Sequence, residues 1–298
     1  MQIAVVVVTW NCADSLSTLV DSMNLHLEPA SVQLVVVDNA SDDDPISRAH
    51  AWRGDLETVL LPVNRGFGVA SNTGVRVAAH DAVVLLNPDT WLVDGSVLEL
   101  GRAALSLRAL VGPRILNPDG TVQPSASAAP VGPWPWVRAL APVAAMPRPI
   151  VARTEPWRLR ETVRVSWLTG ACIAAPRELL LRLGPFDEAI EMYGEDMDLG
   201  LRAAAEGVAS YFLPDVARVV HVGDASASRR FADRGLSATA ASFGDVLLRR
   251  YGSTRAHRGL LAEQLRVRVR IYAKRALRRD AAREAAWLQA LTAAQRPC

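Results

Sequence analysis

The chain has 298 residues, half of them apolar, and this is enough to bury a large core in one domain or in two lobes. No apolar run approaches the ~18 residues that a membrane span needs, and Met1 is followed almost at once by a strand pattern. We therefore expect no span, no signal peptide and a cytoplasmic protein. The three cysteines lie far apart without a CxxC pair, which argues against a disulfide framework or a zinc site, and a formal net charge of +2 excludes little.

Strand and helix patterns alternate from the start of the chain. A β-branched run over Ile3–Thr9 predicts a strand covered on both faces, and apolar residues at helical spacing after Asp14 predict a helix. A second buried strand is expected over Gln33–Val37 and a shorter third one over Glu57–Leu61. Alternating strands and helices favour an α/β fold with a Rossmann-like, mainly parallel sheet flanked by helices.

A glycine-containing segment, Asn64–Gly68, precedes the next predicted helix. Glycines at 66 and 68 would let the backbone pass close to a ligand, and the first turn of the helix would offer free N–H groups toward it. The fourth strand, Ala82–Leu86, then stops abruptly at a polar turn that contains Asp89.

Polar side chains follow three of these strands at the point where each ends. The carboxyl ends of parallel strands meet at one edge of a sheet, so these side chains should form one concave polar site. The alternative is that they only make the turns that end the strands. The residues concerned are Thr9, Trp10 and Asn11, then Asp38 and Asn39, then Asn87 and Asp89.

The middle of the chain is less regular. A helix over Leu98–Leu107 and a strand from Leu110 to Ile115 are expected before a turn at Asn117–Gly120. The stretch Pro124–Pro156 is crowded with Pro, Ala, Ser and Trp and predicts a long surface loop or a broken helix. Its tryptophans either form an apolar lip over a substrate or seal the loop onto the core; they are Trp134 and Trp136, followed by Trp157.

A strand over Val165–Pro176 is interrupted by Gly170, which often marks the close approach of a ligand or of another backbone. After a short helix comes the densest acidic segment, with Glu195, Asp196 and Asp198 near a predicted helix start. Three carboxylates exceed what a helix cap needs, so at least one is a candidate general base. His221 follows a last strand, and on the residues alone it is a structural histidine rather than a metal ligand.

The tail from Gly235 onward predicts two or more helices with arginine-rich faces. Such helices either lie on an anionic membrane surface or pack against the catalytic domain or a dimer partner. No known nucleic-acid reader accompanies the charge, so we expect no nucleic-acid partner.

Eight motifs, in order and spacing, resemble the inverting family 2 glycosyltransferases over about residues 1–226, and more narrowly their bacterial rhamnosyltransferase branch. The stretch RILNPDGTVQPSA (Arg114–Ala126) also resembles actinobacterial enzymes that add L-rhamnose to a polyprenyl-diphosphate N-acetylglucosamine. The eight motifs are VTWN (Val8–Asn11), VDNASDD (Val37–Asp43), NRGFGVASNTG (Asn64–Gly74), LLNPDT (Leu85–Thr90), WLTGACI (Trp167–Ile173), GPFDE (Gly184–Glu188), YGEDMDLGLR (Tyr193–Arg202) and HVGDAS (His221–Ser226).

The resemblance implies a GT-A fold over residues 1–234, with a nucleotide-sugar half (1–113) and an acceptor half (114–234), followed by a basic helical region (235–298). It implies an inverting hexosyltransferase acting on dTDP-L-rhamnose or another nucleotide sugar and on a glycan or lipid-linked acceptor. Peripheral contact with the inner face of the plasma membrane and a homodimer stay open. The donor-binding residues would be Thr9, Trp10, Asn11, Asp38, Asn39, Gly66, Gly68, Asn72, Asn87 and Asp89.

By the same resemblance Asp89 is the last carboxylate of a DxD motif whose first position is Asn87, and Asp89 with His221 would bind Mn²⁺ or Mg²⁺. Asp196 would be the general base of a single in-line displacement, and Asp198 would support the helix start. The acceptor would meet Trp167, Gly170 and Glu195.

Two other functions compete with this interpretation. A nucleotidyltransferase would need a glycine-rich phosphate loop with a lysine near the N-terminus, which the sequence lacks. An inactive sugar-nucleotide-binding scaffold would not need Asp89, Asp196 and His221 together. The sequence leaves open whether the donor is a dTDP-, UDP- or GDP-sugar.

Overall fold

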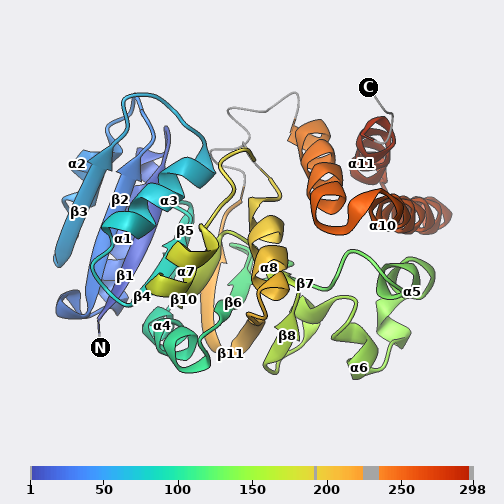
Figure 1. The fold of residues 1–298 in the computed structure, drawn as a ribbon, viewed down its shortest axis with the longest axis horizontal. Helices are drawn as coiled ribbons and strands as arrows, with labels where there is room; N and C mark the ends of the chain where they lie inside the picture. The colour runs from blue at the N-terminus through green and yellow to red at the C-terminus, as the bar shows by residue number, and fades with distance from the viewer. Residues whose placement is uncertain (1, 191–192, 224–234, 295–298) are drawn as a thin grey trace.

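The computed structural model describes residues 2–190, 193–223 and 235–294, and over this part of the chain it is an α/β fold with a nine-stranded sheet (Figure 1). The strands are β1 Ile3–Thr9, β2 Val32–Asp38, β3 Asp55–Leu60, β4 Ala82–Leu86, β5 Thr90–Leu92, β6 Leu110–Leu116, β7 Ala126–Ser127, β8 Val163–Val165, β9 Trp167–Leu168, β10 Cys172–Pro176 and β11 Ser210–His221. The α-helices are α1 Ala13–His26, α2 Pro45–Ala49, α3 Phe67–Val77, α4 Ser96–Leu107, α5 Trp134–Leu140, α6 Arg148–Val151, α7 Arg177–Leu183, α8 Glu195–Ala205, α10 Gly235–Ala276 and α11 Ala282–Ala293.

The sheet has the strand order β3-β2-β1-β4-β10-β6-β11-β5, with β8 paired to β11. The strands β3, β2, β1 and β4 are all parallel, as the alternating pattern predicted. Beyond them β10 runs antiparallel to β4 and β6, and β11 is parallel to β6 and antiparallel to β5 and β8. The parallel expectation therefore describes the first half of the chain, and the second half is mixed.

Two apolar layers cover the two faces of the sheet. Alternate residues of β1 supply them: Val5 packs with α1 and α4 on one face, and Val6 packs with α3, α7 and α8 on the other. This follows from the period of two in a strand, and it explains why Ile3–Thr9 is apolar throughout, since both faces are buried. The fold is thus a three-layer α/β/α arrangement.

Two helical glycines let helices approach β1 closely from opposite faces. A Cβ added at Gly74 of α3 would lie 2.3 Å from Val6 Cγ1, and one added at Gly101 of α4 would lie 2.7 Å from Ile3 Cγ2. Neither distance is tolerated by real side chains, so both helices depend on glycine for their fit. The close fit of α3 also fixes the start of that helix, next to the ends of β1 and β2.

The C-terminal helices form a layer of their own beside α5 and α8 (Figure 1). The helix α10 is interrupted at Gly252, where φ is 74°, and its two parts pack with α11 around buried residues that include Leu247, Leu260 and Leu291. A second contact joins α10 to α8 through Val246, Met197 and other apolar residues. The prediction of two or more helices after Gly235 is confirmed over the described residues.

The proline-rich stretch of the middle region is a broken helix, with α5 and α6 as its longest helical pieces. Of its tryptophans, Trp157 packs against the core, whereas Trp134 lines a cavity described below. No helix within the described ranges is long and apolar enough to cross a membrane.

Candidate active site

The carboxyl ends of β1 and β2 hold a compact group of polar side chains. Thr9 and Asp38 are partners in the parallel register, and Thr9 Oγ1 donates a hydrogen bond of 3.3 Å to Asp38 Oδ1. Ser41 Oγ donates to the same carboxylate and accepts a 3.0 Å hydrogen bond from the backbone N–H of Asn11. The strand ends thus bring Thr9, Asn11 and Asp38 together, with Trp10 half-buried beside them.

Asn39 is used to hold a loop. Its Nδ2 donates to Asn64 Oδ1 over 3.0 Å and to Gly66 O over 3.2 Å, and its Oδ1 accepts a 2.9 Å hydrogen bond from Arg65 N–H. Gly66 precedes α3 with φ of 86°, a conformation that favours glycine. Asn39 and Gly66 therefore shape the loop before α3, and contact between Asn39 and a nucleotide stays a prediction.

Asn72 and Gly68, two of the residues expected to line a diphosphate, contact the segment that follows α7. The buried Asn72 side chain exchanges two hydrogen bonds of 2.9 Å with the backbone of Phe186, and its Nδ2 also lies 3.2 Å from Glu188 Oε1. A Cβ added at Gly68 would lie 3.3 Å from Phe186 Cβ. Both residues therefore join α3 to the segment after α7, and their polar and steric requirements are met there.

Asp89 and His221 come from opposite halves of the chain and face each other. Asp89 Oδ1 lies 3.2 Å from His221 Nε2, and both side chains are largely buried. Gln123 Oε1 accepts a 3.0 Å hydrogen bond from His221 Nδ1, so the neutral imidazole carries its proton on Nδ1 and a lone pair on Nε2. Asn87 Nδ2 donates to that lone pair over 3.3 Å. An imidazole lone pair beside a carboxylate oxygen is an arrangement that attracts a cation.

The residues at this position fit a divalent ion that is shared with a phosphate. No group of three or more His, Cys, Asp or Glu able to hold a metal occurs in the described part of the chain, so Asp89 and His221 would supply such an ion with two ligand atoms. Mg²⁺ and similar hard ions are commonly bound through one or two carboxylates, with substrate phosphates and water in the remaining positions. The two ligands therefore suit an ion that arrives with, or is completed by, a nucleotide diphosphate.

One short segment connects this pair to the acidic helix. The backbone N–H of Asn87 donates to Ala171 O over 3.0 Å, and the N–H of the adjacent Gly170 donates to Asp196 Oδ2, also over 3.0 Å. Asp196 lies in the first turn of α8, where its Oδ1 accepts a second hydrogen bond from Met197 N–H. The turn after β4 and the carboxylate of Asp196 therefore meet at the same side of the sheet.

Burial raises the pKa of both carboxyl groups at the start of α8. The pKa of Asp196 is raised by burial, and the hydrogen bonds from Gly170 and Met197 act against this rise. The pKa of Glu195 is raised to about 8 by burial and then by the negative charge of Asp196, and its Oε2 has no hydrogen-bond partner among the described residues. Near neutral pH Glu195 therefore keeps its proton beside an ionisable Asp196.

Asp198 does not support the helix start as expected. Its side chain is fully buried and accepts a 2.7 Å hydrogen bond from Arg202 Nε and another from Arg250 Nε of α10. Trp167 of β9 packs closely against α8, because a Cβ added at Gly200 of that helix would lie 2.5 Å from Trp167 Cβ. Asp198 is thus the ion-pair partner that ties α8 to α10.

Sequence patterns missed two residues that hold the site together. Gln123 orients His221, and Ser41 bridges Asp38 to the backbone of Asn11. Ser41 stood in a recognisable cluster of Asp, Asn and Ser, but nothing local distinguished Gln123, which lies 98 residues before its partner. Cys172 needs no functional role, since burial raises the pKa of its thiol to about 12.

Comparison with known proteins decides the family. The family described as "Glycosyltransferase like family 2" matches residues 1–240. The chain belongs to glycosyltransferase family 2. This glycosyltransferase is 30% identical over 241 residues to the N-acetylglucosaminyl-diphospho-decaprenol L-rhamnosyltransferase of Mycobacterium tuberculosis, a match that covers 73% of this chain and 75% of that protein. It is also 30% identical over 224 residues to the O-antigen biosynthesis protein RfbC of Myxococcus xanthus, covering 73% of this chain and 17% of RfbC.

Solved structures with the same fold confirm the GT-A architecture of this glycosyltransferase. The mannosyltransferase PcManGT of Pyrobaculum calidifontis, in complex with GDP-Man and Mn²⁺, has a TM-score of 0.58 at 19% identity, covering 98% of this chain and 79% of PcManGT. GalNAc-T7 with UDP, GalNAc and Mn²⁺ scores 0.57 at 19% identity, covering 74% of this chain and 43% of GalNAc-T7. At this identity the likeness establishes the fold.

Proposed function

We propose that this glycosyltransferase transfers L-rhamnose from dTDP-L-rhamnose, with inversion, to a hydroxyl of a polyprenyl-diphosphate-linked sugar. The choice of sugar and acceptor follows the relative from Mycobacterium tuberculosis, whose name states a rhamnosyl transfer to N-acetylglucosaminyl-diphospho-decaprenol, and the choice of dTDP follows the motif resemblance to rhamnosyltransferases. One observation carries the mechanism: residues 170–171 hydrogen-bond both the turn that contains Asn87 and the carboxylate of Asp196. A donor bound at that turn would therefore lie next to a candidate base.

Asp196 is the general base of the proposal. It removes the proton of the acceptor hydroxyl as the hydroxyl oxygen attacks the anomeric carbon, and the bond from that carbon to the nucleoside diphosphate breaks on the opposite face. The hydrogen bonds from Gly170 and Met197 aim its carboxylate, while burial raises its pKa and so makes it a stronger base. The neighbouring Glu195, protonated near neutral pH, offers its unpaired Oε2 as a hydrogen-bond donor to the acceptor.

Asp89 and His221 are the residues that would hold Mn²⁺ or Mg²⁺. A bound ion would neutralise the charge that develops on the departing diphosphate. Gln123 keeps the His221 lone pair directed at this position, and Asn87, which replaces the first carboxylate of a DxD motif, donates to it.

The donor's nucleoside is assigned to the group around Asp38. The Asp38 carboxylate, held by Thr9 and Ser41, is placed to accept hydrogen bonds from a base or a ribose. Trp10 and Asn11 follow directly on β1, and the loop held by Asn39 brings Gly66 to the start of α3. In this scheme residues 1–113 bind the donor and residues 114–234 supply the base and the acceptor surface.

The proposal is tested by nucleotide release from dTDP-L-rhamnose, UDP-glucose, UDP-galactose and GDP-mannose, each with Mn²⁺ or with EDTA. We expect release of dTDP from the rhamnose donor, dependent on the metal. Because a general base contributes roughly 10²–10⁴-fold, Asp196→Asn should lower turnover by at least about a hundredfold while calorimetry still shows nucleotide binding. Preference for a UDP- or GDP-sugar would correct the donor. Equal function of Asp196→Asn would favour a binding scaffold, and no nucleotide binding at all would overturn the proposal.

A further inference from the structure

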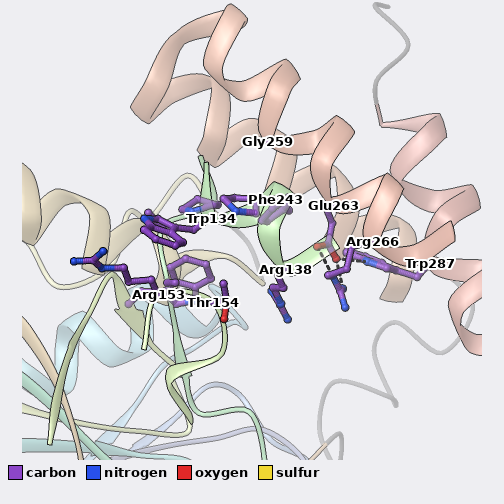
Figure 2. Close-up of a pocket in the computed structure, with 14 residues that line it drawn as sticks. Trp134, Arg138, Arg153, Thr154, Phe243, Gly259, Glu263, Arg266 and Trp287 are labelled. Carbon is purple, nitrogen blue, oxygen red and sulfur yellow. Dashed lines mark hydrogen bonds and ion pairs between the residues drawn. The ribbon is translucent and has the colours of Figure 1, made fainter. Parts of the chain in front are cut away.

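A cavity lined by aromatic and arginine side chains lies between the broken helix of the middle region and the C-terminal helices (Figure 2), and neither Asp89 nor His221 lines it. Its volume is about 200 Å³. Ligand sites for whole small molecules usually measure about 300–1,000 Å³, so this cavity is sized for one group of a larger ligand. Three tryptophans and three arginines line it: Trp134, Trp167 and Trp287, and Arg138, Arg153 and Arg266.

The walls of this cavity carry an excess of positive charge. Arg138, Arg153 and Arg266 line it, and Glu263 is the one carboxylate among its lining residues. Glu263 is already engaged, since it binds Arg266 and accepts a 3.2 Å hydrogen bond from Trp287 Nε1. Behind the wall Glu155 is shared by Arg138 and Arg158. Four guanidinium groups therefore face two carboxylates, which leaves two positive charges uncompensated.

Hydrogen-bond donors in the cavity remain available to a ligand. Arg138 uses Nε to reach Glu155 over 3.2 Å, and its two terminal nitrogens make no hydrogen bond to any residue that the structure describes. Arg153 lies over the ring of Trp134, 5.0 Å from its centroid, and has no carboxylate within ion-pair distance among the described residues. A guanidinium with unused donors in a fixed fork suits a phosphate group.

Burial and a neighbouring arginine both disfavour the charge of Arg138, whereas, against the effect of burial, Glu263 holds the pKa of Arg266 above its usual range. Figure 2 shows Arg138 of α5 and Arg266 of α10 on adjoining parts of the wall. The pKa of Arg138 is lowered, first by burial and then by the positive charge of Arg266. An anion beside Arg138 would relieve both effects on that residue, because it returns a charged partner to a desolvated cation and screens the repulsion from Arg266.

A continuous stretch of backbone joins the cavity to the proposed base. Trp167 lines the cavity, and Gly170, three residues later, donates to Asp196 Oδ2 over 3.0 Å. Three residues span at most about 11 Å. Trp167 and Gly170 therefore lie within about 11 Å of each other, near enough for one acceptor to place a hydroxyl at Asp196 and an anionic group in the cavity.

From this arrangement we infer that the cavity binds the diphosphate of the glycosyl acceptor. Arg138 and Arg153 contact its oxygens, with Arg266 adding charge from α10, and the indole rings of Trp134 and Trp167 border the sugar that carries it. The inference rests on the proposed function, because it takes the acceptor hydroxyl to lie at Asp196. It also gives the C-terminal helices a part in acceptor selection, since α10 and α11 make one wall of the cavity.

The inference is tested first by direct binding. Calorimetry with farnesyl diphosphate, inorganic pyrophosphate and farnesol is carried out in EDTA, so that metal-dependent binding at the donor site is suppressed. We expect the wild-type protein to bind both diphosphates and not farnesol. The double variant Arg138→Gln/Arg153→Gln should bind each diphosphate at least tenfold more weakly. Arg182→Gln, an exposed arginine of α7, is the matched control and should bind like the wild type.

The same variants are then compared in transfer assays with two acceptors, N-acetylglucosaminyl diphosphate linked to farnesol and an alkyl N-acetylglucosaminide without the diphosphate. The double variant should raise KM for the diphosphate acceptor at least tenfold and leave KM for the alkyl glycoside and for the donor unchanged. Tighter binding of pyrophosphate than of farnesyl diphosphate, with no effect on the acceptor KM, would identify a site for a free anion and overturn the inference.

The two proposals fail in different ways. Unchanged diphosphate affinity in the double variant overturns the cavity assignment even if the wild-type protein transfers rhamnose normally. Absence of nucleotide release from every donor overturns the proposed function, and the calorimetric comparison of the double variant with Arg182→Gln still decides whether the cavity binds a diphosphate.

Discussion

Among single residues, Gln123 has the most specific effect on the proposed metal position. It accepts from His221 Nδ1 over 3.0 Å while its own Nε2 donates to His221 O and to Asn117 Oδ1, each over 2.7 Å. These contacts fix both the tautomer and the ring orientation of His221. A residue that acts on a metal through the ligand's second nitrogen typically changes metal affinity by about 10–100-fold.

We therefore predict that Gln123→Ala weakens Mn²⁺ binding by about 10–100-fold, because the His221 lone pair is no longer held toward Asp89. Electron paramagnetic resonance titration of Mn²⁺, with nucleoside diphosphate present, measures this without turnover. Gln123→Glu keeps an acceptor for Nδ1 and should lose less affinity. Gln2→Ala, at an exposed glutamine, is the control. Unchanged Mn²⁺ affinity in Gln123→Ala would show that His221 is not oriented by this contact.

The raised pKa of Glu195 leads us to expect that the stability of the fold depends on pH. Its pKa in the folded protein is raised from the ordinary 4.5 to about 8 by burial and by Asp196, so between these pH values the folded state holds a proton that the unfolded chain releases. Stability must therefore fall as pH rises through this interval. Below about pH 4.5 both states are protonated, so Glu195 no longer makes stability depend on pH.

Glu195→Gln keeps the shape of the protonated side chain but cannot ionise, so it should remove the part of the loss of stability with rising pH that Glu195 causes. We expect the variant to match the wild type at pH 4.5 and to be more stable than the wild type at pH 8.5, as measured by urea unfolding at both pH values. The exposed Glu178→Gln serves as the control and should show no such gain. A parallel fall in the wild type and in Glu195→Gln would mean that Glu195 is ionised in the folded protein at neutral pH.

Between elements, the contact of α8 with α10 depends on Asp198. Arg202 holds this buried carboxylate from the same helix and also donates to Pro185 O over 2.9 Å, so it ties α8 to the segment after α7. Arg250 holds the other oxygen from α10, at 2.6 Å. The helix that carries Asp196 is thus braced from two sides, once within the catalytic part of the chain and once by the C-terminal helices.

We predict that Arg250→Met destabilises the fold by about 1–3 kcal/mol, the usual cost of losing a hydrogen bond to a buried charged group that keeps one partner. The neighbouring Arg249→Met is a matched control. Arg249 pairs at the surface with Asp245 and Asp187, and such pairs contribute only about 0–1 kcal/mol. Urea unfolding of both variants measures the difference. If both variants lost the same stability, Asp198 would not depend on α10.

What the sequence could predict ends where contacts become long-range. The strand ends at Thr9, Asp38 and Asp89 were predictable because buried apolar runs stop there and polar residues follow. The contact of Asn72 with Phe186 was not predictable, because the two residues lie 114 positions apart and only the packing of α3 brings them together. Asp198 was assigned to the helix start for the same reason, since only the fold brings Arg250 to it.

Over the whole molecule, the two halves of the sheet differ in how well the sequence predicts their strands. In the parallel half each strand has five or more residues and a helix between it and the next, so periodicity identifies both. In the mixed half β5 and β8 have three residues each and their direction is set by pairing with β11. Such short strands carry no readable period. The cavity between α5 and α10 was equally hidden, because its walls are separated by more than a hundred residues of chain.

The end of α10 presents an exposed surface that combines arginines with apolar side chains. Val269, Tyr272 and Leu277 are exposed there, Tyr272 to 72%. The exposed basic residues around them are Arg268, Arg270, Arg275, Arg278 and Arg279. Apolar side chains in a basic surface are typical of helices that lie in the interface of an anionic membrane, where each basic residue near the lipid contributes about 1 kcal/mol.

We predict that the protein sediments with phosphatidylglycerol-containing vesicles and not with pure phosphatidylcholine vesicles, since a lipid-linked acceptor would be met at such a surface. The triple variant Arg275→Gln/Arg278→Gln/Arg279→Gln removes about 3 kcal/mol of attraction and should lower the partition coefficient by about a hundredfold. The triple variant Arg53→Gln/Arg102→Gln/Arg182→Gln removes the same charge from the catalytic part of the chain. Since salt screens surface charges over about 10 Å at 0.1 M, binding of the wild type should also weaken as salt rises. Equal loss of binding in both triple variants would mean that net charge, and not the end of α10, determines membrane contact.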